Sequence, residues 1–290
     1  MTRPSSYHEA GLRGDLLVGD DYSDEEIAAW FEAERSGYYD LLVGPGTSGQ
    51  DFAYGEHALN VRHGFRRLPP GTRFSNVLGF GAGFGHELRP ILPRVDGPIT
   101  IVESASSYTT RALDGRPLEY VSAAPDGRIP VEDDRFDLAT CFGVLHHIPN
   151  VSFVLRELHR VMAPGGHLLV REPVVSMGDW RQPRPGLTKN ERGIPKRLLL
   201  QALQAAGFEV VSQRWCMFAA SHPLANLVRF PAPWNSRVFV ALDGWLAKAF
   251  AWNHRYSSRH RLAKLGPDNL FVVARKPLRS SSSSPSASRR

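Results

Sequence analysis

Short apolar runs alternate with amphipathic segments from residue 74 onwards. The runs are β-prone and continuously hydrophobic, which is typical of strands buried on both faces of a parallel sheet. The predicted strands are residues 74–80, 99–102, 118–121, 136–142, 167–170, 208–216 and 270–275. Helices are predicted at 85–92, 107–113, 151–162 and 194–206. This alternation predicts an α/β fold with a doubly wound, mostly parallel, seven-stranded sheet.

The segments outside this alternation set the expected domain boundaries. The first twenty residues show no regular pattern and are expected to be poorly ordered. A helix is expected from Ser23, where Glu26 completes a capping box, and a second helix at 55–68. The predicted parts are an N-terminal helical cap (1–70), a ligand-binding core (71–216), an aromatic and basic insertion (217–268), the last strand (269–278) and a disordered tail (279–290).

Positive charge is concentrated in the C-terminal part of the chain. The net charge is +6, but residues 213–290 hold 13 Lys/Arg and only 2 Asp/Glu. Such a surplus beside an acidic body indicates attraction to an anionic partner, or simply a solvated arginine-rich surface. An anionic small molecule, a membrane surface and nucleic acid are all open as partners. The insertion, with a predicted helix at 238–250, carries most of this charge.

Several classes of protein are disfavoured by composition. Cys141 and Cys216 form neither a disulfide framework nor a metal spacing, which fits a reducing, cytoplasmic location. The N-terminal segment lacks the apolar core of a signal peptide, and no apolar run reaches the roughly 18 residues of a membrane span. No metal is expected, because no histidine and carboxylate set has a metal-binding spacing.

The candidate ligand-binding element is the turn after the first strand, within FSNVLGFGAGFGHE. Gly81, Gly83 and Gly85 leave bare backbone against which a ligand can lie. A dinucleotide fingerprint would place its third glycine at His86, so a nicotinamide oxidoreductase is the weaker alternative. Glu103 ends the second strand, where an acidic side chain can accept both hydroxyls of a ribose.

Four motifs in order resemble the class I S-adenosylmethionine-dependent methyltransferases, closest to the type-11 methyltransferase domain group. The motifs are FSNVLGFGAGFG, ITIVES, IPVEDDRFDLATCFGVLHHIPN and VLRELHRVMAPGGHLLVREP, within residues 74–215, and the strand at 270–275 completes the match. The resemblance implies a Rossmann-like sheet, S-adenosyl-L-methionine as cofactor and methyltransferase activity. It does not identify the methyl acceptor.

Carried over residue by residue, the resemblance also implies a cofactor site. Its members would be Gly81, Gly83 and Gly85 for the methionine moiety, Glu103 for the ribose, Asp126 (shifted by one residue) for the adenine, and Phe142 as pocket lining. Relatives usually carry an acid where this chain has Gly79, and that acid helps to hold the methionine ammonium. Glu87 could replace it; weaker cofactor binding or a non-catalytic descendant are the alternatives.

His146 and His147 follow the fourth strand and are the candidate catalytic residues. Methyl transfer to a hydroxyl needs a base whose pKa lies near the working pH, and histidine fits best. We therefore expect a small-molecule or glycan-like acceptor, with oxygen as the first choice of atom and carbon or nitrogen open. Nucleic acid is disfavoured, because Phe142-Gly143-Val144-Leu145 stands where base methyltransferases carry an Asn/Asp-Pro-Pro-Tyr/Phe segment.

Overall fold

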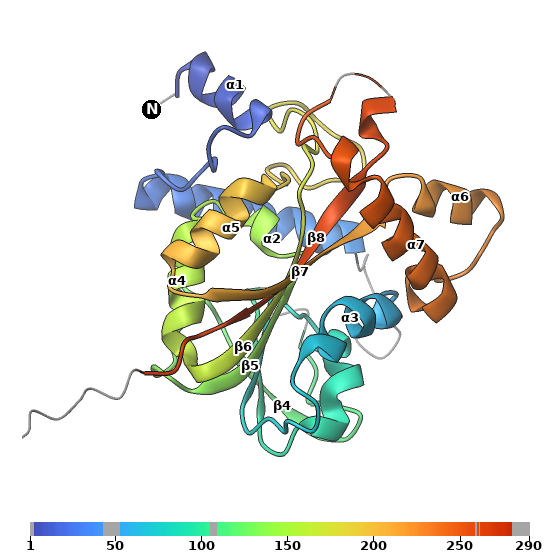
Figure 1. Ribbon diagram of the computed structural model, residues 1–290. Coiled ribbons are helices and arrows are strands. Elements are labelled where there is room, and N and C mark those ends of the chain that lie inside the picture. The colour runs from blue at the N-terminus through green and yellow to red at the C-terminus, as the bar shows by residue number, and fades with distance from the viewer. Residues whose placement is uncertain (1–2, 43–52, 105–108, 259, 261, 280–290) are drawn as a thin grey trace, which may run out of the picture.

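The computed structural model describes residues 3–42, 53–104, 109–258, 260 and 262–279. At its centre is an eight-stranded sheet in the order β3-β4-β2-β1-β5-β6-β8-β7, flanked by helices (Figure 1). The strands are β1 Val77–Phe80, β2 Ile99–Val102, β3 Ala112–Leu113, β4 Arg116–Val121, β5 Phe136–Phe142, β6 Met162–Pro173, β7 Glu209–Phe218 and β8 Pro267–Arg275. The predicted doubly wound α/β fold is confirmed, and β3 is the one strand that was not predicted.

Strand direction brings the functional segments to one edge of the sheet. Strands β4, β2, β1, β5 and β6 pair in parallel, so their carboxyl ends meet at the same edge. Strand β8 runs antiparallel to both of its neighbours, β6 and β7. The insertion between β7 and β8 therefore leaves and re-enters the sheet at this same carboxyl edge.

Helices cover both faces of the sheet (Figure 1). They are α1 Ser5–Arg13, α2 Asp24–Leu42, α3 His57–His63, α4 Val151–Val161, α5 Lys196–Ala205, α6 Ser221–Leu227 and α7 Arg237–Ala249. One core contains Leu155 of α4 and Leu203 of α5, and the other contains Leu59 of α3 and Val240 of α7. Helix α3 is one of the two helices predicted to form the N-terminal cap, and it packs with α7 of the insertion. Within the described residues, no helix has the length and apolar character needed to cross a membrane.

Two local predictions were wrong. A helix was predicted at 107–113, but Ala112 and Leu113 form β3, which pairs with β4 through a turn at Asp114-Gly115. Both turn residues have positive φ (48° and 81°), and Asp-Gly is a hairpin signal that outweighs the helical pattern. The N-terminal segment, expected to be poorly ordered, contains α1, which packs with Trp180. The predicted tail falls largely on 280–290, outside the described residues.

Candidate active site

A pocket lies at the carboxyl edge of the sheet and has an open volume of about 890 Å³. Gly81, Glu103 and Gly143, each of which follows the last residue of a strand, line it. Phe31, Glu34 and Arg35 of α2 form another wall.

The glycine turn shapes this pocket through its backbone. Gly81 has φ +64°, and a Cβ added there would lie 2.6 Å from the Val144 side chain, so the turn and the loop after β5 approach too closely for another residue. Gly83 and Gly85 also have positive φ but do not line the pocket. The Gly83 amide instead donates to Glu103 Oε2 at 3.1 Å, and thereby helps to aim that carboxylate.

Glu103 is placed to bind a diol. Its Oε1 accepts from the Ser104 amide at 2.9 Å, so its carboxylate is held at the end of β2 beside the glycine turn. The small apolar residues Ala124 and Pro125 after β4 line the adjacent part of the pocket. A carboxylate next to an apolar slot matches the ribose and the base of an adenosine.

Two residues predicted to contact the cofactor lie elsewhere. The Asp126 carboxylate accepts from the Arg128 amide at 2.9 Å and stabilises its own turn, while its neighbours Pro125 and Gly127 line the pocket. The Phe142 ring does not line the pocket either; it packs 5.2 Å from the Phe271 ring in the opposite core. Asp126 lies in the turn after β4, between Pro125 and Gly127, and Phe142 is the last residue of β5, next to Gly143.

Gly79 leaves no room for an acidic side chain. A Cβ added there would lie 2.7 Å from Ala82 Cβ and 2.8 Å from Ile101 Cδ1. Glu87, the carboxylate expected to replace that acid, is only 4% exposed, accepts from Thr140 Oγ1 and does not line the pocket. Its burial raises the pKa to about 7, although the bond from Thr140 opposes this. Among the residues that the structure describes, Glu34 and Glu103 are the carboxylates that line the pocket.

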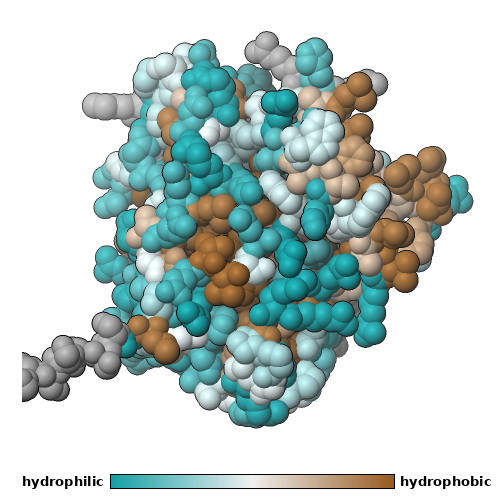
Figure 2. Space-filling view, viewed as in Figure 1, coloured by the Kyte–Doolittle hydropathy of each residue, from teal (hydrophilic) through white to brown (hydrophobic). Residues whose placement is uncertain are grey.

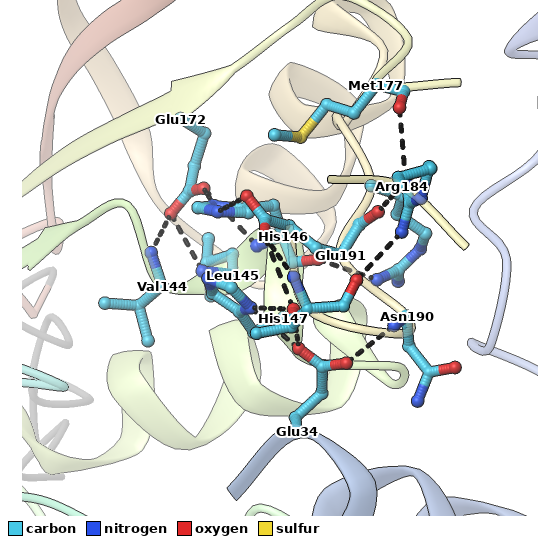
Figure 3. Close-up of polar contacts among 12 residues, drawn as sticks. Glu34, Val144, Leu145, His146, His147, Glu172, Met177, Arg184, Asn190 and Glu191 are labelled. Atoms are coloured by element: carbon cyan, nitrogen blue, oxygen red, sulfur yellow. Dashed lines mark hydrogen bonds and ion pairs between the residues drawn. The ribbon is translucent and has the colours of Figure 1, made fainter. Parts of the chain in front are cut away.

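His146 is held between two carboxylates (Figure 3). Its Nδ1 lies 2.7 Å from Glu172 Oε2, and its Nε2 lies 3.5 Å from Glu191 Oε1. Burial disfavours the charged imidazole, but Glu172 and then Glu191 outweigh it and raise the pKa of His146 to about 9. His146 does not line the pocket; its ring nitrogens face Glu172 and Glu191 instead.

His147, in contrast, lines the pocket. Its Nδ1 lies 2.8 Å from Glu34 Oε2, on α2. Burial and the adjacent charge of His146 lower the pKa of His147, despite the neighbouring carboxylate. The two adjacent histidines therefore differ in protonation, with His146 charged and His147 neutral near pH 7.

Comparison with known proteins identifies the family to which this arrangement belongs. A family model described as a methyltransferase domain matches residues 54–213, which is more than half of the chain. The chain belongs to the methyltransferase domain family. The predicted Rossmann-like fold is confirmed by this match, and S-adenosylmethionine is confirmed as the cofactor at the level of the family.

Individual relatives of this chain are distant. YcgJ of Bacillus subtilis, named an uncharacterized methyltransferase, is 32% identical over 101 residues, or 32% of this chain and 39% of that protein. The ubiquinone/menaquinone biosynthesis C-methyltransferase UbiE of Neisseria meningitidis is 27% identical over 165 residues, which cover 55% of this chain and 64% of that protein. Both matches thus cover less than two thirds of the relative.

Solved structures support the fold of the methyltransferase. The N-methyltransferase NodS of Bradyrhizobium japonicum, in complex with S-adenosyl-L-homocysteine, superposes with a TM-score of 0.53 at 13% identity, covering 84% of this chain and 99% of that chain. At this identity the similarity shows the fold alone.

Sequence reasoning missed the residues that hold the two histidines. They come from α2 and from the loop between β6 and α5. They include Glu34 and Glu191 (Figure 3), together with Thr188 and Arg192. Arg192 is 4% exposed and donates to the carbonyls of Val18, His146, Ile148 and Pro149. No spacing in the sequence marks these residues, because each lies far along the chain from its partner.

Atoms of His146, His147 and Glu191 also lie within 4.8 Å of one another, close enough to share a metal ion. Both ring nitrogens of His146 face carboxylates. The proton that each nitrogen shares with its carboxylate accounts for the close approach of these groups without a metal ion. The expectation that the methyltransferase uses no metal stays a prediction.

The charged state of His146 predicts a pH-dependent stability. The pKa of His146 is about 9 in the folded protein and about 6.5 in the unfolded protein. Its contribution to the stability of the fold is therefore complete below pH 6.5 and is lost as the pH rises through 9. We expect the melting temperature to fall between about pH 7 and pH 10, and to fall less steeply in His146→Gln. Differential scanning calorimetry across this range measures both slopes. Parallel slopes would show that His146 is not the group responsible.

Proposed function

We propose that this methyltransferase transfers a methyl group from S-adenosylmethionine to a hydroxyl of a small-molecule or glycan-like acceptor, with His147 as the general base. The observation that carries the proposal is the position of His147, which lines the same pocket as Gly81 and Glu103. A cytoplasmic location is part of the proposal and is supported by two cysteines that are free and buried.

The residues that line the pocket are chemically suited to S-adenosylmethionine. Glu103 would accept hydrogen bonds from the ribose hydroxyls, and Ala124 and Pro125 would face the adenine. The backbone at Gly81 would lie against the methionine part, where the close approach of Val144 excludes a side chain. When bound, this cofactor would supply an electrophilic methyl group on its sulfonium sulfur. The sulfur would leave as a neutral thioether, which needs no proton.

The chain's own contribution to the chemistry is to position the acceptor and remove its proton. With the Nδ1 proton of His147 donated to Glu34, the lone pair of the ring is on Nε2. As the acceptor oxygen forms its bond to the methyl carbon, its proton moves to Nε2. Glu34 stabilises the imidazolium, since hydrogen bonds from His147 and Thr188 outweigh its burial and keep the pKa of Glu34 below the ordinary value.

Replacing His147 with asparagine tests this role. Asparagine keeps a polar side chain of similar size but cannot act as the base, so kcat is expected to fall by about 10²–10⁴-fold. The affinity for S-adenosylhomocysteine is expected to stay within about twofold, because the ribose contact at Glu103 is intact. The assay incubates the enzyme with labelled S-adenosylmethionine and a panel of hydroxylated small molecules, and mass spectrometry locates the methyl group.

The control is His222→Asn on α6, an exposed histidine away from the pocket, which should leave kcat unchanged. In the wild type, kcat should rise with pH and level off below about pH 6.5, the ordinary pKa of histidine, because that of His147 is lowered. An unchanged kcat in His147→Asn would reject His147 as the base.

A carbon acceptor is the second candidate, because the name of the relative UbiE is that of a C-methyltransferase. An activated carbon such as that of a phenol ring also loses a proton to a base, so His147 would serve either reaction. The position of the methyl group in the product distinguishes the two.

A further inference from the structure

Helix α7 in the insertion has two apolar faces. The inner face is buried against the sheet and carries the apolar residues Val240 and Ala247, with one buried acid, Asp243, between them. The outer face is exposed to solvent and carries Val238 (70% exposed), Leu242 (60%) and Trp245 (67%). The outer residues are spaced i, i+4, i+7, so they form one stripe along the helix.

The neighbouring segments extend this apolar surface. Helix α6 exposes Leu224, Leu227 and Val228, which are spaced i, i+3, i+4, and the turn after α7 exposes Trp252 at 79%. Apolar side chains gather over α6 and α7 at the right of the molecule (Figure 2). Single exposed apolar residues are ordinary, but a contiguous set on two helices marks an interaction surface.

The exposed charges on the described residues of the insertion are of one sign. Five basic residues of the insertion are described, and all of them are exposed: Arg229, Arg237, Lys248, Arg255 and Lys264. The two acidic residues of the segment are turned inward. Asp243 is 1% exposed and accepts from the Met217 and Phe218 amides, and Asp268 is half-buried.

We infer that the outer faces of α6 and α7 form a docking surface for an anionic membrane. Helices with exposed tryptophan and leucine beside lysine and arginine bind at the boundary between lipid headgroups and acyl chains. Each basic residue near such a surface adds attraction to anionic lipid. A second copy of the chain is less suited to this surface, since two surfaces of the same positive sign repel each other.

The topology places this surface at the same edge of the sheet as the pocket. The insertion begins after Phe218, at the end of β7, and ends at Pro267, at the start of β8. Both positions lie at the carboxyl edge of the sheet, where Gly81 and Glu103 line the pocket. Docking through α6 and α7 therefore brings the edge of the sheet that carries the active site toward the membrane, although docking itself does not depend on the proposed methyl transfer.

Vesicle flotation with the full chain tests the inference. The probes are vesicles of phosphatidylcholine alone and of phosphatidylcholine with phosphatidylglycerol, and the wild type should float only with the anionic vesicles at low salt. Replacing both Trp245 and Trp252 with serine should lower the partition coefficient about tenfold or more. Arg237→Glu with Lys248→Glu should lower it at least about tenfold, because each basic residue contributes separately.

The matched control is Arg156→Glu, which reverses an exposed charge on α4, on the opposite face of the sheet from α7. It should leave vesicle binding within about twofold. Every variant should retain wild-type affinity for S-adenosylhomocysteine, which verifies folding and keeps this test separate from that of the proposed function. Absence of wild-type binding to anionic vesicles, or equal binding by all variants, would overturn the inference. So would a dimer in analytical ultracentrifugation that the tryptophan replacements dissociate, because a second copy would then cover the surface.

Discussion

Replacing Glu103 with alanine is expected to weaken the binding of S-adenosylhomocysteine by about 10²–10⁴-fold, because hydrogen bonds to a charged group contribute about 1.5–3 kcal/mol each and two ribose hydroxyls lose their acceptor. The Glu103 carboxylate is held for this contact by the Gly83 and Ser104 amides. Isothermal titration calorimetry of the wild type and the variant measures the ratio of the two dissociation constants.

Two further variants make the Glu103 result specific. Glu103→Gln keeps the shape and one acceptor oxygen, so its affinity should lie between those of the wild type and Glu103→Ala. Glu119→Ala on β4 removes a carboxylate whose side chain is 54% exposed, and it should bind like the wild type. Equal affinities of the wild type and Glu103→Ala would remove Glu103 from the cofactor site.

Replacing Glu172 with alanine is expected to lower the free energy of unfolding by about 3–5 kcal/mol, the usual cost of breaking a buried ion pair on one side. Glu172 is fully buried, and it accepts from the Val144 and Leu145 amides at 2.9 and 2.8 Å as well as from His146 Nδ1. Its loss leaves a charged imidazole and backbone amides without their acceptor. Urea denaturation followed by circular dichroism measures the loss.

The matched control for Glu172 is Glu209→Ala on β7, which removes an ion pair with Arg275 whose side chains are both about half exposed. This control should lower the free energy of unfolding by less than about 1 kcal/mol, because exposed ion pairs contribute little to stability. A loss below about 1 kcal/mol for Glu172→Ala as well would contradict the assignment of Glu172 and His146 as the pair that holds the loop after β5.

The parts of this site that could be predicted from sequence depend on backbone geometry and local order. A strand followed by Gly81 and a second strand followed by Glu103 must place both residues at one edge of a parallel sheet, whatever packs around them. The same reasoning placed His147 after the fourth predicted strand, β5, and the structure brings all three residues to one pocket. It also predicted the insertion, because the chain between β7 and β8 is longer than a hairpin needs.

The parts that could not be predicted depend on side chains that meet only in the folded chain. Glu34 reaches His147 from α2, across 113 positions of sequence, and Glu191 reaches His146 from a loop without regular spacing. The different states of the two histidines follow from these partners and not from the His-His pair itself. Helix α1 was missed for the same reason, since its packing partner Trp180 lies far along the chain.

The central claim is that the pocket between the glycine turn, Glu103 and α2 binds the cofactor of a methyltransferase. The measurement that tests it most directly is a crystal structure of the protein grown with S-adenosylhomocysteine. The account predicts the ribose hydroxyls on the Glu103 carboxylate, the adenine against Ala124 and Pro125, and the sulfur on the side of the pocket lined by His147. Binding of S-adenosylhomocysteine at any other place, or a structure in which saturating S-adenosylhomocysteine leaves this pocket empty, would contradict it.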